Sequence, residues 1–270
     1  MPDAVPGFAL AAYDLKHEPV MQVAADAAGV ALAGSAAQAL AGAEAVLSLV
    51  TADQALPAAL AYAPHLAPGA LWFDMNSVAP ETKRAAARAV TDAGGRYVDV
   101  AVMSPVHPAR RDVPLLLSGP DAEHGIALLR ALGFTRLRRV DGDVGAASAI
   151  KMIRSVMIKG IEALTAECVL AAEAAGVREE VLASLDASAS AKPWAERADY
   201  NLDRMLVHGV RRAAEMEEVV RTLDALGTGS VMSRGTVERQ RALGSLSLAP
   251  PEGLAAKLAA LATRKQEKAA

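Results

Sequence analysis

The sequence predicts an α/β fold in which a mostly parallel, doubly wound sheet is followed by an all-helical C-terminal domain. Short apolar segments alternate with helix-like segments through the first half, a pattern typical of strands covered by helices on both faces of a parallel sheet. The alternation stops near residue 145, and the segments that follow have the character of helices. With 270 residues, 53% of them hydrophobic, the chain is long enough for two modest domains with a substantial core.

Seven short segments are predicted as strands because most of them are apolar and are bounded by turn-forming or charged residues. They are residues 8–13, 30–33, 45–50, 71–73, 97–102, 113–117 and 137–140. The predicted helices between them are 20–28, 52–62, 80–93 and 122–132. The helices predicted after the boundary are 146–175, 179–188, 194–204, 213–226, 235–243 and 251–261. The domains are therefore predicted as residues 1–144 and 145–270.

Composition excludes several kinds of partner. A net charge of −3 and an isoelectric point near 6.0 do not favour nucleic acid or an anionic membrane, because binding phosphates requires a basic surface. The most apolar stretch, residues 55–73, is interrupted by three prolines, whereas a membrane-spanning helix needs roughly 20 uninterrupted apolar residues. No basic, then apolar, leader follows Met1, so a cytoplasmic location is expected.

An acidic residue ends the first predicted strand. Asp14 follows residues 8–13, and Lys16 comes two positions later. A carboxylate at the end of the second strand of a dinucleotide-binding, Rossmann-like fold accepts hydrogen bonds from the adenosine ribose and repels a 2′-phosphate. Asp14 and Lys16 are therefore candidate cofactor-binding residues that favour NAD over NADP, although Lys16 weakens that preference. The alternative interpretation is an ordinary aspartate in a turn.

Polar residues also follow two later strands. Val50 and Thr51 follow the strand AVLSLV, and Asn76 and Ser77 follow LWFD. Ligands bind at the carboxyl edge of open α/β sheets, where such groups can bond the carboxamide and ribose of a nicotinamide. All four are candidate cofactor-binding residues. Asn76 and Ser77 are equally compatible with turn and cap positions.

The segment GDVGAASAIKMIRSVMIKG, residues 142–160, carries the strongest chemical signal. Its two glycines allow the backbone to pass closely into a long helix, on which Lys151, Ser155 and Lys159 share one face at a spacing of four. Oxidising a hydroxyl group requires a base for the alcohol proton, and a lysine can serve where burial and neighbouring positive charge lower its pKa. The alternative is a solvated basic helix face.

Four motifs resemble the β-hydroxyacid dehydrogenase and 6-phosphogluconate dehydrogenase superfamily. They are NSVAPETKR, VDVAVMSPVHP, IKMIRSVMIKGIEALTAEC and HGVRRAAEM, and the likeness extends over nearly the whole chain. It is most similar to a bacterial subgroup of NAD(P)-dependent oxidoreductases with a C-terminal domain of unknown function. The resemblance implies a nicotinamide cofactor, NAD or NADP with NAD favoured, a small anionic substrate and a homodimer. No metal is expected.

The resemblance also assigns roles to individual residues. Lys151 falls on the position of the acid/base lysine, and Ser155 replaces the asparagine that orients the substrate. The substrate-binding Ser-Gly-Gly stretch of the family aligns with Met103, Ser104 and Pro105, so a standard hydroxyisobutyrate or phosphogluconate substrate is not assumed. His107 follows this loop and is a further candidate substrate-binding residue.

Basic residues in the C-terminal half form a second set of candidates. In phosphogluconate dehydrogenases such residues from a partner subunit complete the substrate site, which implies an analogous role for His208, Arg211 and Arg212 in HGVRR. Lys159, two turns after Lys151, is predicted to join them. A helix start with exposed arginines is the alternative interpretation of HGVRR.

One expected feature is missing from the sequence. The Gly-x-Gly-x-x-Gly fingerprint occurs nowhere, and only MPDAVPGFALAAY precedes Asp14, where a strand, glycine turn and helix would need on the order of 30 residues. We expect that the first βα unit is missing, through a misplaced start, a truncation or a true deletion. The predicted function is hydride transfer between a nicotinamide and a small hydroxy acid or sugar acid. The alternative is a cofactor-deficient, non-catalytic homologue that acts only as a helical dimer.

Overall fold

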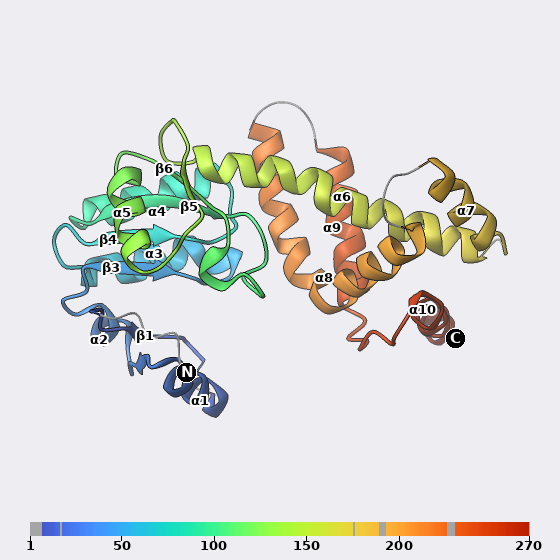
Figure 1. Cartoon of the computed structure of the whole chain (residues 1–270), viewed down its shortest axis with the longest axis horizontal. Helices are drawn as coiled ribbons and strands as arrows, with labels where there is room; N and C mark the ends of the chain where they lie inside the picture. The colour runs from blue at the N-terminus through green and yellow to red at the C-terminus, as the bar shows by residue number, and fades with distance from the viewer. Residues whose placement is uncertain (1–6, 17, 175, 189–192, 226–229, 270) are drawn as a thin grey trace. The chain divides into compact units, whose positions relative to one another are not determined.

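The computed structural model describes residues 7–16, 18–174, 176–188, 193–225 and 230–269. They form two compact units, Met1–Met152 and Ile153–Ala270. The first is an α/β unit and the second is helical, which confirms the predicted fold class (Figure 1). The division between the units falls inside helix α6 (Ala146–Ala174), and the boundary between residues 144 and 145 stays a prediction.

Five strands of the first unit form one sheet, in the order β3-β4-β5-β6-β7. Their bounds are Ala45–Ser48, Leu71–Asp74, Arg96–Val102, Leu115–Ser118 and Leu137–Arg139. Only the β5–β6 pair is antiparallel, so the sheet is mostly parallel, as predicted. β1 (Ala11–Ala12) and β2 (Ala31–Leu32) form a second, two-stranded parallel sheet.

Helices of the first unit cover both faces of the main sheet, and alternate residues of each strand face opposite helices. Trp72 and Tyr97 pack against α3 (Ala55–Tyr62) and α4 (Pro80–Asp92), whereas Phe73 and Val98 pack against α5 (Ala122–Ala131) on the opposite face. Successive residues of a strand point to opposite faces, so a strand covered on both faces must be continuously apolar. The remaining elements are α1 (Pro19–Ala28), α2 (Ala36–Leu40) and the 3-10 helices Ala52–Gln54, Ala63–His65 and Arg110–Asp112.

After α6, the second unit consists of α7 (Arg178–Ser188), α8 (Trp194–Ala225), α9 (Val231–Gly244) and α10 (Leu254–Ala269). The prediction of two helices at 194–204 and 213–226 is wrong, because α8 is continuous between them. Gly209 lies inside α8 and faces α9: a Cβ there would be 2.3 Å from the carbonyl oxygen of Gln240. The glycine therefore permits close helix packing and does not end a helix.

A row of buried polar side chains crosses the main sheet. Ser48, Asp74, Asp99 and Ser118 are register partners on the adjacent strands β3 to β6, and each has less than a tenth of its surface exposed. The Nζ of Lys83, from α4, lies 2.8 Å from Oδ1 of Asp74 and 3.5 Å from Oδ1 of Asp99. Buried charges persist when they are paired and hydrogen-bonded. Both carboxylates pair with Lys83 and accept hydrogen bonds, although Oδ1 of Asp99 has the ion pair alone among the described residues.

Tyr97 is hydrogen-bonded to this row on the face of the sheet that α4 covers. Its hydroxyl donates a hydrogen bond of 2.6 Å to Oδ2 of Asp74. Burial, followed by the nearby Asp74 carboxylate, raises the pKa of the Tyr97 phenol well above its ordinary value.

Within the described part of the chain, no helix combines the length and the apolar character needed to cross a membrane.

The close packing of α8 against α9 predicts that two glycine-to-alanine substitutions have different effects on stability. Gly209→Ala should destabilise the protein by about 1–3 kcal/mol, because the added methyl group meets the backbone of α9. Gly235→Ala, inside α9 with open space around its Cβ position, should be neutral or stabilising by up to about 1 kcal/mol. Urea denaturation of the two variants measures the difference, and equal midpoints would contradict the proposed packing role.

Tyr97→Phe should lower stability at neutral pH by about 1–3 kcal/mol, because Asp74 loses a buried donor. Above about pH 10 the unfolded chain ionises this tyrosine whereas the folded protein, with its raised pKa, does not, so stability falls as pH rises. The variant lacks the pH dependence that the ionisation of Tyr97 contributes, and its unfolding free energy should fall less steeply between about pH 9 and 11. Parallel curves for wild type and variant would refute this, and Tyr200→Phe, at an exposed position, is the control.

Candidate functional site

The carboxyl ends of β3, β4 and β5 meet at one edge of the main sheet, because these three strands are parallel. This is the edge at which open α/β sheets bind ligands. Six of the residues predicted from the sequence lie just beyond these strand ends: Val50, Thr51, Asn76, Ser77, Met103 and Ser104.

Lys151 reaches the same edge from α6. Its Nζ donates a hydrogen bond to Oγ of Ser77. Gly145, just before the helix, has a φ of 108°, and a Cβ there would lie 2.6 Å from Nη1 of Arg84 and 3.0 Å from Cβ of Pro80. Gly145 therefore meets two requirements, since it takes the left-handed conformation and lets α6 begin against the start of α4.

Asn76 presents an unsatisfied acceptor at this edge. Its Nδ2 donates to Oγ of Ser48 at 3.0 Å and to Oδ1 of Asp74 at 2.9 Å. Its Oδ1 is buried and has no hydrogen-bond partner among the described residues. Buried polar atoms are almost always paired, so this oxygen fits a ligand that brings an N–H donor, such as a primary carboxamide.

Asp14 and Lys16 follow β1, a strand of the two-stranded sheet, and both are exposed. Oδ1 of Asp14 accepts a hydrogen bond of 2.8 Å from the backbone N–H of Lys16, which is an Asx turn. This contact is the one expected for the alternative interpretation, and the ribose-binding role of Asp14 stays a prediction.

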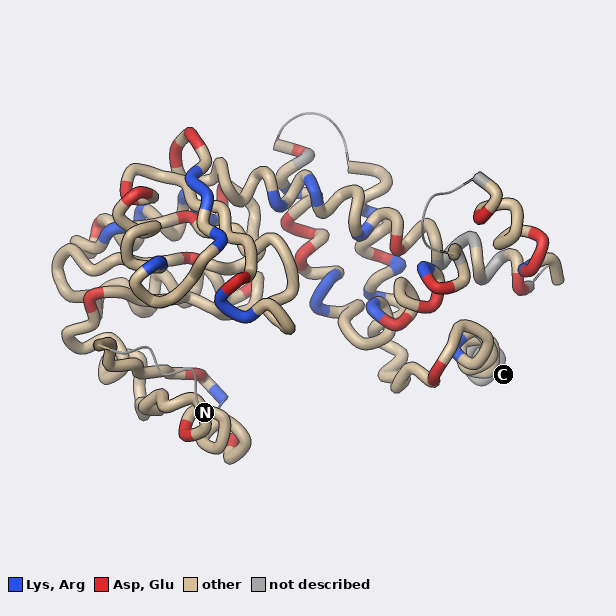
Figure 2. Tube along the Cα trace, in the orientation of Figure 1, with Lys and Arg blue, Asp and Glu red and all other residues tan. Residues whose placement is uncertain are grey.

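Two basic candidates of the second unit, Lys159 and Arg212, lie in a buried ion-pair network. Nζ of Lys159 is 2.7 Å from Oε2 of Glu215, and Arg212 pairs with Glu162. Burial lowers the pKa of Lys159, while Glu215 acts in the opposite direction. Arg211, which is exposed, also pairs with Glu215. Helix α8 carries both basic and acidic residues (Figure 2).

The pKa of His208, also on α8, is lowered first by desolvation and then by the arginines near it. Ser155 is buried on α6, and His107 is exposed in the loop after β5. The substrate-binding roles of Lys159, His208, Arg211 and Arg212 stay predictions, and so do those of Ser155 and His107.

The sequence analysis did not single out four buried residues of the polar row and of α4 that support this edge of the sheet. They are Asp74, Lys83, Asp99 and Ser118. One signal could have found two of them, because Asp74 ends the apolar strand LWFD and Asp99 interrupts the apolar strand YVDVAV. A carboxylate inside a strand that is otherwise buried requires a partner. Lys83, in the polar stretch ETKR, carries no comparable signal.

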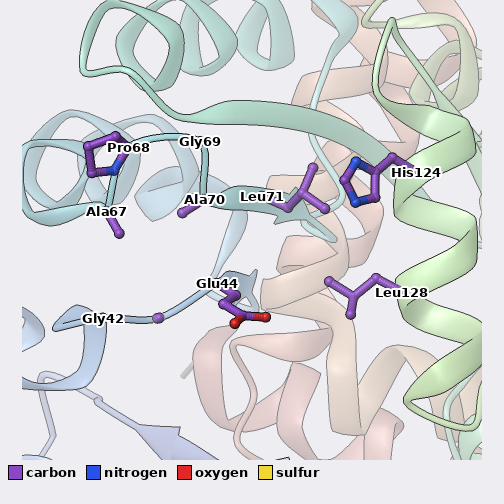
Figure 3. A pocket seen from close by; sticks show the side chains of 10 residues that line it. Gly42, Glu44, Ala67, Pro68, Gly69, Ala70, Leu71, His124 and Leu128 are labelled. Carbon is purple, nitrogen blue, oxygen red and sulfur yellow. The ribbon is translucent and has the colours of Figure 1, made fainter.

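A shallow pocket lies at the opposite, amino end of β3 and β4. Figure 3 shows Glu44 and His124 among the side chains that line it, together with Leu71 and Leu128. Because Glu44 precedes β3 and Leu71 begins β4, the pocket is at the edge away from Lys151 and Ser77. It is therefore not part of the candidate site.

Comparison with known families supports the two-part organisation. Residues 4–128 match the NAD binding domain of 6-phosphogluconate dehydrogenase. Residues 172–243 match a domain of unknown function (DUF1932).

Two solved structures are similar over most of the chain. A conserved hypothetical protein from Sinorhizobium meliloti is 39% identical, with 92% of this chain and 83% of that chain covered and a TM-score of 0.68. The conserved protein MTH1747 is 30% identical, with 89% and 90% covered and a TM-score of 0.66. MTH1747 is described as a protein of unknown function with structural similarity to 3-hydroxyacid dehydrogenases.

A curated relative has a stated activity. An NAD-dependent L-serine dehydrogenase from Pseudomonas aeruginosa is 27% identical over 196 residues, which are 70% of this chain. The chain spans just under two thirds of the length of the curated relatives it matches, 65% and 64%. Taken together, these matches show that the chain belongs to the superfamily of 6-phosphogluconate and 3-hydroxyacid dehydrogenases, in the group with the C-terminal domain of unknown function.

Proposed function

We propose that this protein is an NAD(P)-dependent oxidoreductase that transfers a hydride between a nicotinamide and a small hydroxy acid or sugar acid. The observation that carries the proposal is the contact of Lys151 with Ser77 at the carboxyl edge of an NAD-binding domain. The Lys151 amine and the Ser77 hydroxyl are in contact there, and the preceding residue, Asn76, carries a buried unpaired amide oxygen.

The chain's own contribution to such a reaction is the movement of a proton. Oxidising an alcohol removes a hydride from carbon and a proton from oxygen, and the nicotinamide supplies the hydride acceptor when it is bound. In this proposal the unprotonated amine of Lys151 accepts the hydroxyl proton, while Ser77 orients that amine by hydrogen bonding. In the reverse direction the protonated Lys151 returns a proton to the oxygen.

The cofactor would lie along the edge residues. Asn76 would accept a hydrogen bond from the nicotinamide carboxamide through its unpaired Oδ1, with Ser48 holding the amide in place. Val50 and Thr51 would line the same site. NAD is proposed over NADP because Asp14 would repel a 2′-phosphate.

The proposed substrate class is supported by the substrates of related proteins and by the basic candidate residues. L-serine and 3-hydroxyacids are the substrates named for related proteins, and each carries a carboxylate and a hydroxyl group on the β carbon. We therefore propose a small carboxylated alcohol as the substrate, with Ser104 as one of the groups that bind it. Lys159, Arg211 and Arg212 are proposed separately as anion-binding groups of the second unit.

The second candidate function is a non-catalytic homologue that binds no dinucleotide. The Asx turn of Asp14 favours it, because the carboxylate then makes the contact of an ordinary turn residue and not that of a ribose ligand. Calorimetric titration of the protein with NAD and with NADP separates the two candidates. Micromolar binding of either dinucleotide supports the oxidoreductase, and no measurable heat at millimolar concentration supports the homologue.

Lys151→Ala should lower kcat by about 100-fold or more, the usual effect of losing general acid–base help. Lys151→Arg should lose nearly as much, because a guanidinium keeps the charge but does not release its proton. Nicotinamide absorbance, followed with L-serine and 3-hydroxyisobutyrate as first substrates, measures both variants. The dissociation constant for NAD should change little.

Arg88→Ala, on the exposed surface of α4, is the control and should behave as wild type. Wild-type turnover in Lys151→Ala would remove Lys151 from the chemistry.

A further inference from the structure

The first turn of α6 is held by side chains that the proposed function does not use. Oδ2 of Asp99 accepts hydrogen bonds from the backbone N–H groups of Gly145 at 3.0 Å and Ser148 at 3.1 Å. Oγ of Ser118 accepts one from the N–H of Ala147 at 3.0 Å and donates one to the same oxygen of Asp99. The N-terminus of α6 is therefore capped from two neighbouring strands, β5 and β6.

The negative charge of Asp99 is also favourable at the start of α6. The unpaired N–H groups and the dipole of a helix start favour a nearby anion, and Asp99 is fully buried against them. The other oxygen of Asp99 faces Nζ of Lys83 at 3.5 Å. The carboxylate thus has cationic or N–H partners on both oxygens, which accounts for its place in the interior.

Lys151 lies three residues after Ser148, within one turn of the capped segment. A shift of that turn would move the Lys151 amine relative to Ser77, which is fixed at the end of β4. Proton transfer needs a donor–acceptor separation of about 2.6–3.2 Å. A displacement of about 1 Å can cost on the order of 100-fold in rate.

We infer that Asp99 is a positioning residue for Lys151, and that Ser118 supports it. The inference rests on the proposed function, in which Lys151 handles the hydroxyl proton. Asp99 makes no contact with the reacting groups in this scheme, and it acts by fixing the start of α6 on the sheet.

The test uses Asp99→Asn, which keeps an acceptor oxygen but loses the charge, and Ser118→Ala, which removes one supporting hydroxyl. Asp121→Asn is the matched control, because Asp121 pairs with Arg96 in the same unit and precedes α5 instead of α6. Three quantities are measured on the full chain: amide hydrogen exchange in residues 145–150, the rate at which acetic anhydride modifies Lys151, and kcat with KM.

We expect amide exchange in residues 145–150 to be about tenfold faster in Asp99→Asn, the effect of weakening one charged hydrogen bond. Lys151 should be acetylated several-fold faster, without cofactor or substrate present. The value of kcat should fall about tenfold or more, with KM and NAD affinity little changed. Ser118→Ala should show the same pattern to a smaller extent, and Asp121→Asn should match wild type.

Three outcomes would overturn the inference. They are wild-type kcat in Asp99→Asn, unchanged acetylation of Lys151 in both Asp99→Asn and Ser118→Ala, or the same loss of activity in Asp121→Asn. Ser118→Ala decides the matter where Asp99→Asn does not fold. Failure of the proposed function is a separate result: it is shown by wild-type turnover in Lys151→Ala or by no binding of either dinucleotide. Amide exchange and acetylation still report on the capping of α6 in both cases.

Discussion

A buried ammonium group, that of Lys83, lies between two buried carboxylates at the centre of the first unit. Asp74 and Asp99 are register partners on β4 and β5, so the parallel pairing of these strands brings two negative charges together inside the protein. Such an arrangement is strongly unfavourable without a cation, and α4 supplies one at 2.8 Å and 3.5 Å. The sheet, α4 and the start of α6 all depend on this balance.

The same polar row connects two parts of the candidate site. In the β4 part of the row, Asp74 accepts hydrogen bonds from Asn76, whose unpaired Oδ1 is proposed to accept a hydrogen bond from the carboxamide of a nicotinamide. In the β5 part, Asp99 accepts hydrogen bonds at the start of α6, one turn before Lys151. A single buried network therefore supports both the proposed cofactor contact and the proposed proton acceptor. These proposed roles would account for the carboxylates in the sheet, where apolar residues would cost less to bury.

The sequence predicts those parts of the fold that depend on local pattern. The strands around residues 71–73 and 97–102 are found within a few residues, because a continuous apolar run bounded by turns is a local signal. Helix α8 is divided wrongly, because a glycine in a polar segment has the same local appearance whether it ends a helix or allows a neighbouring helix to approach. The short helix α2 is missed, although Ser35 caps it through its hydroxyl group.

The candidate site is predictable to a smaller degree. Lys151 and Ser77 are each singled out from the sequence, but their contact depends on where α6 begins against the end of β4. The row of Ser48, Asp74, Asp99 and Ser118 depends on strand register, which joins residues far apart in the chain. Lys83 is recognisable only once that row is known, because its partners come from other elements.

The most direct test of this account is a double-mutant cycle between Lys83 and Asp99, measured by urea denaturation. Lys83→Met alone should cost about 3–5 kcal/mol, because it leaves two buried carboxylates without their cation. Adding Asp99→Asn removes one of those charges, so the double variant should be more stable than the sum of the single effects predicts, by about 1 kcal/mol or more. Effects that add within about 0.5 kcal/mol would show that the ammonium and the Asp99 carboxylate do not depend on each other, and would contradict the account.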